Sequence, residues 1–179
     1  MARSYYRRRW YGRRTFRKKN WSSNIITTST TITFPANTTY GAGSALCLNP
    51  SQSVSTVSQP FTIKNIKLSI VSQSDELNVP LYVDNLTVAI MYVPQGYTVS
   101  YNTLSEHPEW VMAIKFLDDP TLVPGTSNGI IKPFTVSTRL ARKLQTGDSV
   151  QLCVFGTNNG NSACTARFKF LAQWWTCAN

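Results

Sequence analysis

Apolar and polar residues alternate along much of this chain, and this alternation constrains the fold more than any other feature of the sequence. A period of two places every second side chain on one face of a β-strand. Seven runs follow the pattern, at residues 24–34, 60–73, 85–94, 109–117, 129–140, 148–156 and 165–175. No stretch has the spacing of a convincing amphipathic helix, although residues 141–145 could form one helical turn. The sequence therefore predicts an all-β body.

The connections between these runs indicate which all-β architecture to expect. They are long, uneven and rich in Pro, Gly, Ser and Asn. Several short strands in one domain indicate an antiparallel sandwich or barrel, and long crossing connections favour a single antiparallel jelly-roll sandwich. A jelly roll needs an eighth strand. Ala45–Leu48 is the candidate, within a region from Pro35 to Pro60 that otherwise predicts a loop.

The alternation also predicts which side chains face the core. Its phase changes near Lys64 and Asn65, which predicts a β-bulge inside one long strand. Arg167 and Lys169 are expected only to mark the outward face of the last strand. The predicted inward-facing residues are Ile26, Ile32, Phe34, Phe61, Ile63, Ile66, Leu68, Ile70, Leu86, Val88, Ile90, Tyr92, Trp110, Met112, Ile114, Phe116, Phe134, Val136, Val150, Leu152, Val154, Phe168 and Phe170.

Charge divides the chain into two unequal parts. Nine of the 18 Lys and Arg residues lie between residues 3 and 19, where there is no Asp or Glu. Residues 20–179 hold the other nine basic residues and all eight acidic ones, so this part is nearly neutral. Blocks of like charge repel and are rarely buried. We therefore predict a basic interaction arm at residues 1–21 and a folded domain at residues 22–179.

Aromatic residues are spaced through the basic arm, at Tyr5, Tyr6, Trp10, Tyr11 and Phe16. Guanidinium groups bind phosphate oxygens in pairs, and aromatic rings stack on unpaired bases with little base preference. The arm therefore predicts binding to single-stranded nucleic acid, with nuclear import compatible; a membrane-surface helix is disfavoured because arginines surround the helix on all sides. The predicted contacts are Arg3, Arg7, Arg8, Arg9, Trp10, Arg13, Arg14, Arg17, Lys18 and Lys19.

A second basic group, Arg139, Arg142 and Lys143, lies in the sequence STRLARKLQTGDS. One interpretation is a solvated face, or pairing with the nearby Asp148. The other is a contact on the body for the same polyanion that the arm binds. The sequence favours neither.

Motifs for catalysis, metal binding and membrane insertion are missing from the sequence. The single histidine, His107, has no nucleophile motif beside it, and Asp118-Asp119 before Pro120 are typical turn formers. The four cysteines lack zinc-ligand spacing and are expected to be buried thiols, although a Cys153–Cys164 bridge across a hairpin is an alternative. No apolar run approaches the roughly 18 residues of a membrane span. We expect no enzyme activity, metal, cofactor or membrane insertion.

The basic aromatic start, the β-only body and the stretches VMAIKFLDDP, STRLARKLQTGDSV and QWWTCAN together resemble the capsid proteins of small circular Rep-encoding single-stranded DNA viruses, the circovirus-like group. The resemblance covers nearly the whole chain. It implies two packed four-stranded sheets in a jelly roll, and about 60 copies in a closed icosahedral shell. It further implies an arm that binds the circular single-stranded DNA genome inside the virion, import into the host nucleus through an import receptor, and roles for Arg139 and Arg142. It does not identify a cell-surface receptor.

Other interpretations remain open from the sequence. A cellular single-stranded nucleic-acid-binding protein with a β-barrel body would place aromatic and basic residues on one strand face, which the nearly neutral body disfavours. A jelly-roll ligand binder is usually secreted, and no apolar secretion signal follows the basic start. In a coat protein, the loops Pro35–Pro60 and Pro94–Pro108 would form contacts between copies, through Tyr40, Tyr97 and Tyr101.

Overall fold

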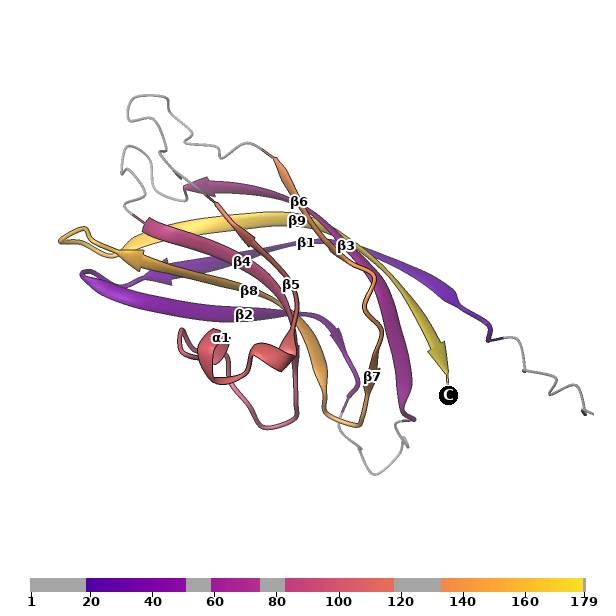
Figure 1. Ribbon diagram of the computed structural model, residues 1–179. Coiled ribbons are helices and arrows are strands. Elements are labelled where there is room, and N and C mark those ends of the chain that lie inside the picture. The colour runs from indigo at the N-terminus through magenta and orange to yellow at the C-terminus, as the bar shows by residue number, and fades with distance from the viewer. Residues whose placement is uncertain (1–18, 51–58, 75–82, 118–132, 179) are drawn as a thin grey trace, which may run out of the picture.

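Two antiparallel β-sheets pack face to face in the computed structural model, which describes residues 19–50, 59–74, 83–117 and 133–178 (Figure 1). The five-stranded sheet has the order β1-β9-β3-β6, and β7 also pairs with β3. Its strands are β1 (Ser22–Phe34), β9 (Cys164–Ala178), β3 (Phe61–Ser74), β6 (Phe134–Thr138) and β7 (Arg142–Leu144). The four-stranded sheet has the order β2-β8-β4-β5, with β2 (Thr38–Leu48), β8 (Ser149–Asn158), β4 (Val83–Val93) and β5 (Val111–Phe116).

The core lies between the two sheets and follows the predicted alternation closely. Ile63, Leu68, Leu152 and Phe168 are among the side chains that are almost completely buried there. Burying an apolar side chain of this size contributes about 1.5–3 kcal/mol to folding. The predicted bulge is also confirmed, because the pairing of β3 with β9 shifts register between Lys64 and Lys67. Asn65 takes a positive φ of 51° at this point, so Ile63 and Ile66 both face the core.

Three predicted core residues are exposed, and a fourth, Trp110, is buried outside this core, in a separate apolar cluster on the outer face of the four-stranded sheet. Ile26 is 38% exposed, and only Ile32 and Phe34 of β1 pack in the core. Ile114 and Phe116 are 55% and 52% exposed. A register shift opposite Ile90 and Met91 changes the phase of β5, so Ala113 and, just after the strand, Leu117 pack against the core instead.

Two predictions about local structure were wrong. Residues 142–144 form strand β7 rather than a helical turn, because the free edge of β3 at Phe61–Ile63 offers them backbone partners. The predicted loop from Pro35 to Pro60 contains β2, which is longer than the Ala45–Leu48 candidate. Gly41 and Gly43 lie in β2, and glycines in a sequence normally indicate a loop. Gly41 is needed there because a Cβ atom at this position would lie only 2.9 Å from the backbone nitrogen of Tyr101.

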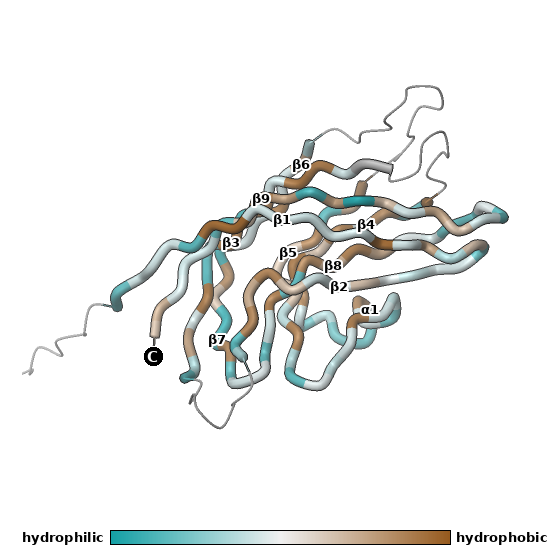
Figure 2. Tube along the Cα trace, turned by 180° about the vertical axis from the view of Figure 1, so that it is seen from behind, coloured by the Kyte–Doolittle hydropathy of each residue, from teal (hydrophilic) through white to brown (hydrophobic). Residues whose placement is uncertain are grey.

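A second apolar cluster covers the outer face of the four-stranded sheet. It contains Ala89, Met91, Val93, Val99, Trp110, Cys153 and Phe155. The segment between β4 and β5 packs over it, with the short helix α1 (Thr103–Glu106) and the 3-10 turn η1 (Pro108–Trp110). Strands β4 and β8 are therefore buried on both faces, and Figure 2 shows β4 as hydrophobic over most of its length. In the described part of the chain, no such segment covers the outer face of the five-stranded sheet.

Candidate nucleic-acid interface

The outer face of the five-stranded sheet carries a set of basic side chains. Register fixes their places: Lys64 and Lys67 on β3 lie opposite Trp175 and Gln173 on β9, and Lys143 on β7 lies opposite Thr62. Arg167 and Lys169 continue this face along β9. Figure 2 shows hydrophilic segments along this strand. The neighbouring positions on β1 are Ser23, Ile25, Thr27, Ser29 and Thr31. Among the described residues of this face there are five basic residues and no acidic one.

Charge is segregated between the two sheets. In the described residues, the strands of the five-stranded sheet and the β6–β7 connection hold seven basic residues and no acidic one: Lys64, Lys67, Arg139, Arg142, Lys143, Arg167 and Lys169. The four-stranded sheet and its connections hold one basic residue, Lys115, and four acidic ones, Asp84, Glu106, Glu109 and Asp148. Among the described residues, the five-stranded sheet is therefore the cationic side of the body and the four-stranded sheet the anionic side.

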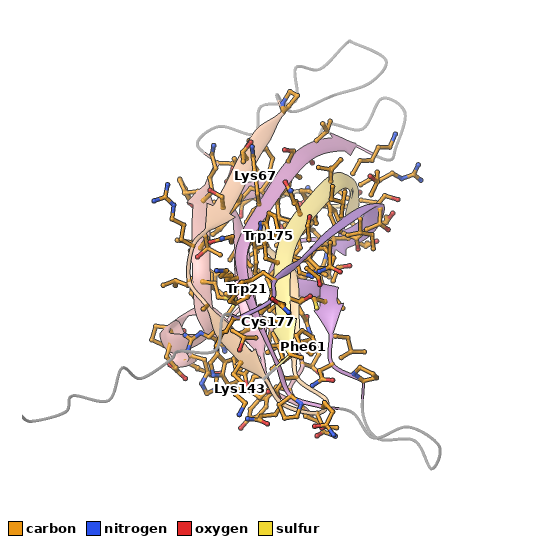
Figure 3. All side chains as sticks on the ribbon, turned by 90° about the vertical axis from the view of Figure 1, so that its right-hand side faces the viewer. Trp21, Phe61, Lys67, Lys143, Trp175 and Cys177 are labelled. Atoms are coloured by element: carbon orange, nitrogen blue, oxygen red, sulfur yellow. The ribbon has the colours of Figure 1, made fainter. Side chains whose placement is uncertain are left out.

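The basic arm joins the body on the cationic side. Trp21 immediately precedes β1, and the Nζ atom of Lys64 lies 3.7 Å from the centre of its ring. This cation–π contact fixes a charge at the point where the arm leaves the sheet. In Figure 3, Lys67, Trp175, Trp21 and Lys143 follow one another along this side of the molecule. Of the predicted arm contacts, only Lys19 is described, and it is exposed; Arg3, Arg7, Arg8, Arg9, Trp10, Arg13, Arg14, Arg17 and Lys18 lie outside the described residues.

A shallow groove of about 460 Å³ opens where β3 bulges beside β6. It is lined by Asn65, Ile66, Lys67, Ser137, Thr138 and Arg139. The groove therefore combines two cationic side chains with amide and hydroxyl groups, which are the groups that proteins use to hold phosphate oxygens. The structure thus places Arg139, a contact predicted from the sequence, beside Lys67, which the sequence did not single out.

Arg142 is directed elsewhere. Its guanidinium donates a hydrogen bond to the backbone oxygen of Glu109 and lies 5.9 Å from the Tyr92 ring centre, both on the four-stranded side. Asp148 is not its partner in the described residues. That carboxylate is buried and accepts hydrogen bonds from the Tyr92 hydroxyl at 2.7 Å and from the backbone N–H groups of Gln95 and Gln145. Arg139 and Arg142 therefore do not share a site.

Groups with catalytic potential are dispersed or occupied. His107 Nδ1 lies 3.1 Å from Glu109 Oε1, and the His107 ring stacks on Trp110 at 3.7 Å. All four cysteines are free thiols, and burial raises the pKa of the Cys47 thiol to about 11, so it is not activated at neutral pH. Asp118 and Asp119 lie outside the described residues.

The described residues form neither a metal centre nor a helical membrane span. No group of three or more of their His, Cys, Asp or Glu side chains is arranged to hold a metal ion. No helix among them has the length and apolar character needed to cross a membrane. The predicted lack of enzyme activity and of a cofactor stays a prediction.

No protein-family model matches the chain, and no curated protein matches it.

Sequence reasoning missed four residues of the basic face, and one available signal could have indicated them. In the sequence, Lys64, Lys67, Arg167 and Lys169 are only single outward positions on separate strands. The available signal is that every charged residue at the described outward positions of β3 and β9 is basic. That one-sided composition is visible in the sequence, but the adjacency of the two strands is not.

Proposed function

We propose that this chain is the coat protein of a small circular single-stranded DNA virus. About 60 copies would assemble into a closed icosahedral shell. The arm and the basic face would hold the genome inside the virion, and the arm would also be the signal for import into the host nucleus. The observation that carries the proposal is that the arm, with nine basic residues in its sequence, leads into a sheet face whose described residues include five basic side chains and no acidic one.

We propose a jelly roll as the body, and the strand order supports it. Strands β1, β3, β6 with β7, and β9 belong to one sheet, and β2, β4, β5 and β8 to the other. The chain thus passes repeatedly between sheets, and β1 and β2 pair with the last two strands, β9 and β8. A double Greek key would give this strand order, and an up-and-down meander would not. Strands β6 and β7 pair with two successive stretches of β3 and act together as one edge strand.

Single-stranded polynucleotide is the partner that fits this surface. Counterion release would give the sequence-independent affinity, and the aromatic residues at the arm and its base would favour unpaired bases. The arms of about 60 copies would place roughly 540 positive charges inside a shell, which offsets encapsidated phosphates.

Exposed apolar side chains away from the basic face support contacts between copies. Tyr97, Tyr101 and Tyr40 are 57%, 42% and 36% exposed. Tyr40 and Tyr101 also line a groove of about 430 Å³ between β2 and the 94–110 segment. Tyr97 packs edge-on against Trp110 and Tyr40 against Phe34, but a large part of each ring stays exposed, and interfaces between proteins are enriched in such tyrosines.

A second candidate function, a cellular single-stranded nucleic-acid-binding protein, gains support from the same face. Basic and aromatic side chains do share one strand face, as such a protein requires. The body, however, consists of two separate packed sheets rather than one barrel.

Negative-stain electron microscopy of the purified full-length protein distinguishes the two functions. We expect uniform closed particles that protect polynucleotide from nuclease. A species of 20.1 kDa at every salt concentration and pH, with no co-purifying polynucleotide, would refute the coat-protein proposal.

A further inference from the structure

The strand register brings an aromatic side chain to the middle of the cationic face. Trp175 is partly exposed, and its cross-strand neighbours are Ser23 on β1 and Lys64 on β3. Ser23 is too small to cover an indole ring. The Nζ atom of Lys64 lies over the ring of Trp21, 3.7 Å from its centre. The contact between Trp21 and Lys64 crosses β9 next to Trp175, which remains partly exposed beside two cations, Lys64 and Lys67.

An apolar path leads from Trp175 along the seam between β1 and β9. Ile25 lies opposite Gln173 and is a diagonal neighbour of Trp175, and Leu171 is a diagonal neighbour of Ile25. These two side chains are 65% and 45% exposed, although folding alone favours polar residues on a solvated strand face. Basic side chains flank the path, with Lys67 on β3 and Lys169 further along β9.

Cationic groups lie within one or two residues of this aromatic surface. Lys67 is opposite Gln173, two residues from Trp175 and hence about 7 Å along the strand. Lys67 and Arg139 line the groove at the β3 bulge, together with the hydroxyl groups of Ser137 and Thr138. An aromatic platform next to a groove with two cations and two hydroxyls has the composition of a nucleotide site, with one part for a base and one for a phosphate.

We propose that the outer face of the five-stranded sheet binds an unpaired nucleotide of a single-stranded polynucleotide, with its base stacked on Trp175 and an adjacent phosphate held by Lys67 and Arg139. The Trp21–Lys64 contact positions the base of the arm beside this site, so that a strand bound by the arm continues onto the body. The inference rests on the proposed function and adds a site to it. A duplex does not fit the site, because its bases are not free to stack on a side chain.

Binding of three probes to the full-length protein tests the site: a single-stranded oligothymidine of about 20 nucleotides, an abasic chain of the same length, and a duplex. Trp175→Leu removes the aromatic face but keeps an apolar side chain. It should weaken oligothymidine binding by at least about fivefold and leave binding of the abasic chain and the duplex unchanged. Trp175→Phe should restore most of the loss. Phe116→Leu, at an exposed aromatic residue of β5 in the four-stranded sheet, is the matched control and should change none of the three.

Photocrosslinking tests the same site without any substitution. An oligothymidine containing 5-iododeoxyuridine, irradiated with the wild-type protein and analysed by mass spectrometry, should label Trp175. Labelling confined to arm residues, or equal loss of all three probes in Trp175→Leu, would overturn the inference. Closed particles that contain polynucleotide in either case would leave the proposed function standing, and failure to form particles would remove the proposed function whatever the crosslinks show.

Discussion

Salt dependence offers a direct test of the basic face, because each lysine that neutralises a phosphate releases counterions. Lys67 and Lys169 are both exposed on the outer face of the five-stranded sheet. The double variant Lys67→Ala/Lys169→Ala lowers the net charge by two. Lys115→Glu lowers it by two as well, at an exposed residue of β5 in the four-stranded sheet. The two variants therefore have the same net charge but change it on different sheets, and Lys115→Glu also removes the contact of the Lys115 Nζ atom with the Phe134 ring at 5.6 Å.

The expected magnitude follows from the number of phosphates that the two lysines neutralise. For single strands, the slope of log K against log salt concentration is about −0.7 for each neutralised phosphate. Without these two lysines, the slope for the double variant should be less steep by about 1.4. Between 50 and 200 mM salt, its affinity should therefore fall about sevenfold less than that of the wild-type protein. Lys115→Glu should keep the wild-type slope.

Fluorescence anisotropy with a labelled oligothymidine, measured at five or more salt concentrations, gives the slope for each full-length protein. Equal slopes for the double variant and the wild-type protein would show that the basic face makes no phosphate contact. A change of equal size in Lys115→Glu would show that only net charge matters, and would refute the reasoning from sheet faces.

Three further predictions concern the arm and the core. Deleting residues 1–19 should abolish nucleic-acid packaging and leave a folded body with an unchanged β-type circular dichroism spectrum; an unfolded product would contradict the division into arm and domain. Asp148→Ala removes the acceptor for three donors around a buried carboxylate, so urea unfolding should show a loss of about 3 kcal/mol or more, whereas Ala at the exposed Asp84 should change stability by less than about 0.5 kcal/mol. Burial, followed by the hydrogen bond to Asp148 and its negative charge, raises the pKa of Tyr92 to about 12, above the usual value near 10. The stability from the neutral phenol is therefore complete below pH 10 and lost as the pH rises through 12, and Tyr92→Phe should lack this part of the alkaline loss in urea titrations.

Much of the fold could be predicted from the sequence, because alternation is a local property. The bulge at Asn65 and the buried faces of β3, β8 and β9 follow from residues that are neighbours in the chain. The errors have equally physical causes. Ile114 and Phe116 point outward because a register shift that depends on β4 reverses the phase of β5, and β2 contains glycines because a distant segment lies against it.

The sequence by itself determined the division of this protein into a strongly basic arm and a nearly neutral β-rich body, since charge content and period-two alternation need no knowledge of distant contacts. Only the tertiary structure decided that the neutral body has a cationic side. That side exists because β3 and β9, about 100 residues apart in the chain, pair in one sheet, while the described acidic residues fold onto the other. Strand pairing over such a distance is selected by the packing of the whole core, and no local pattern in the sequence encodes it.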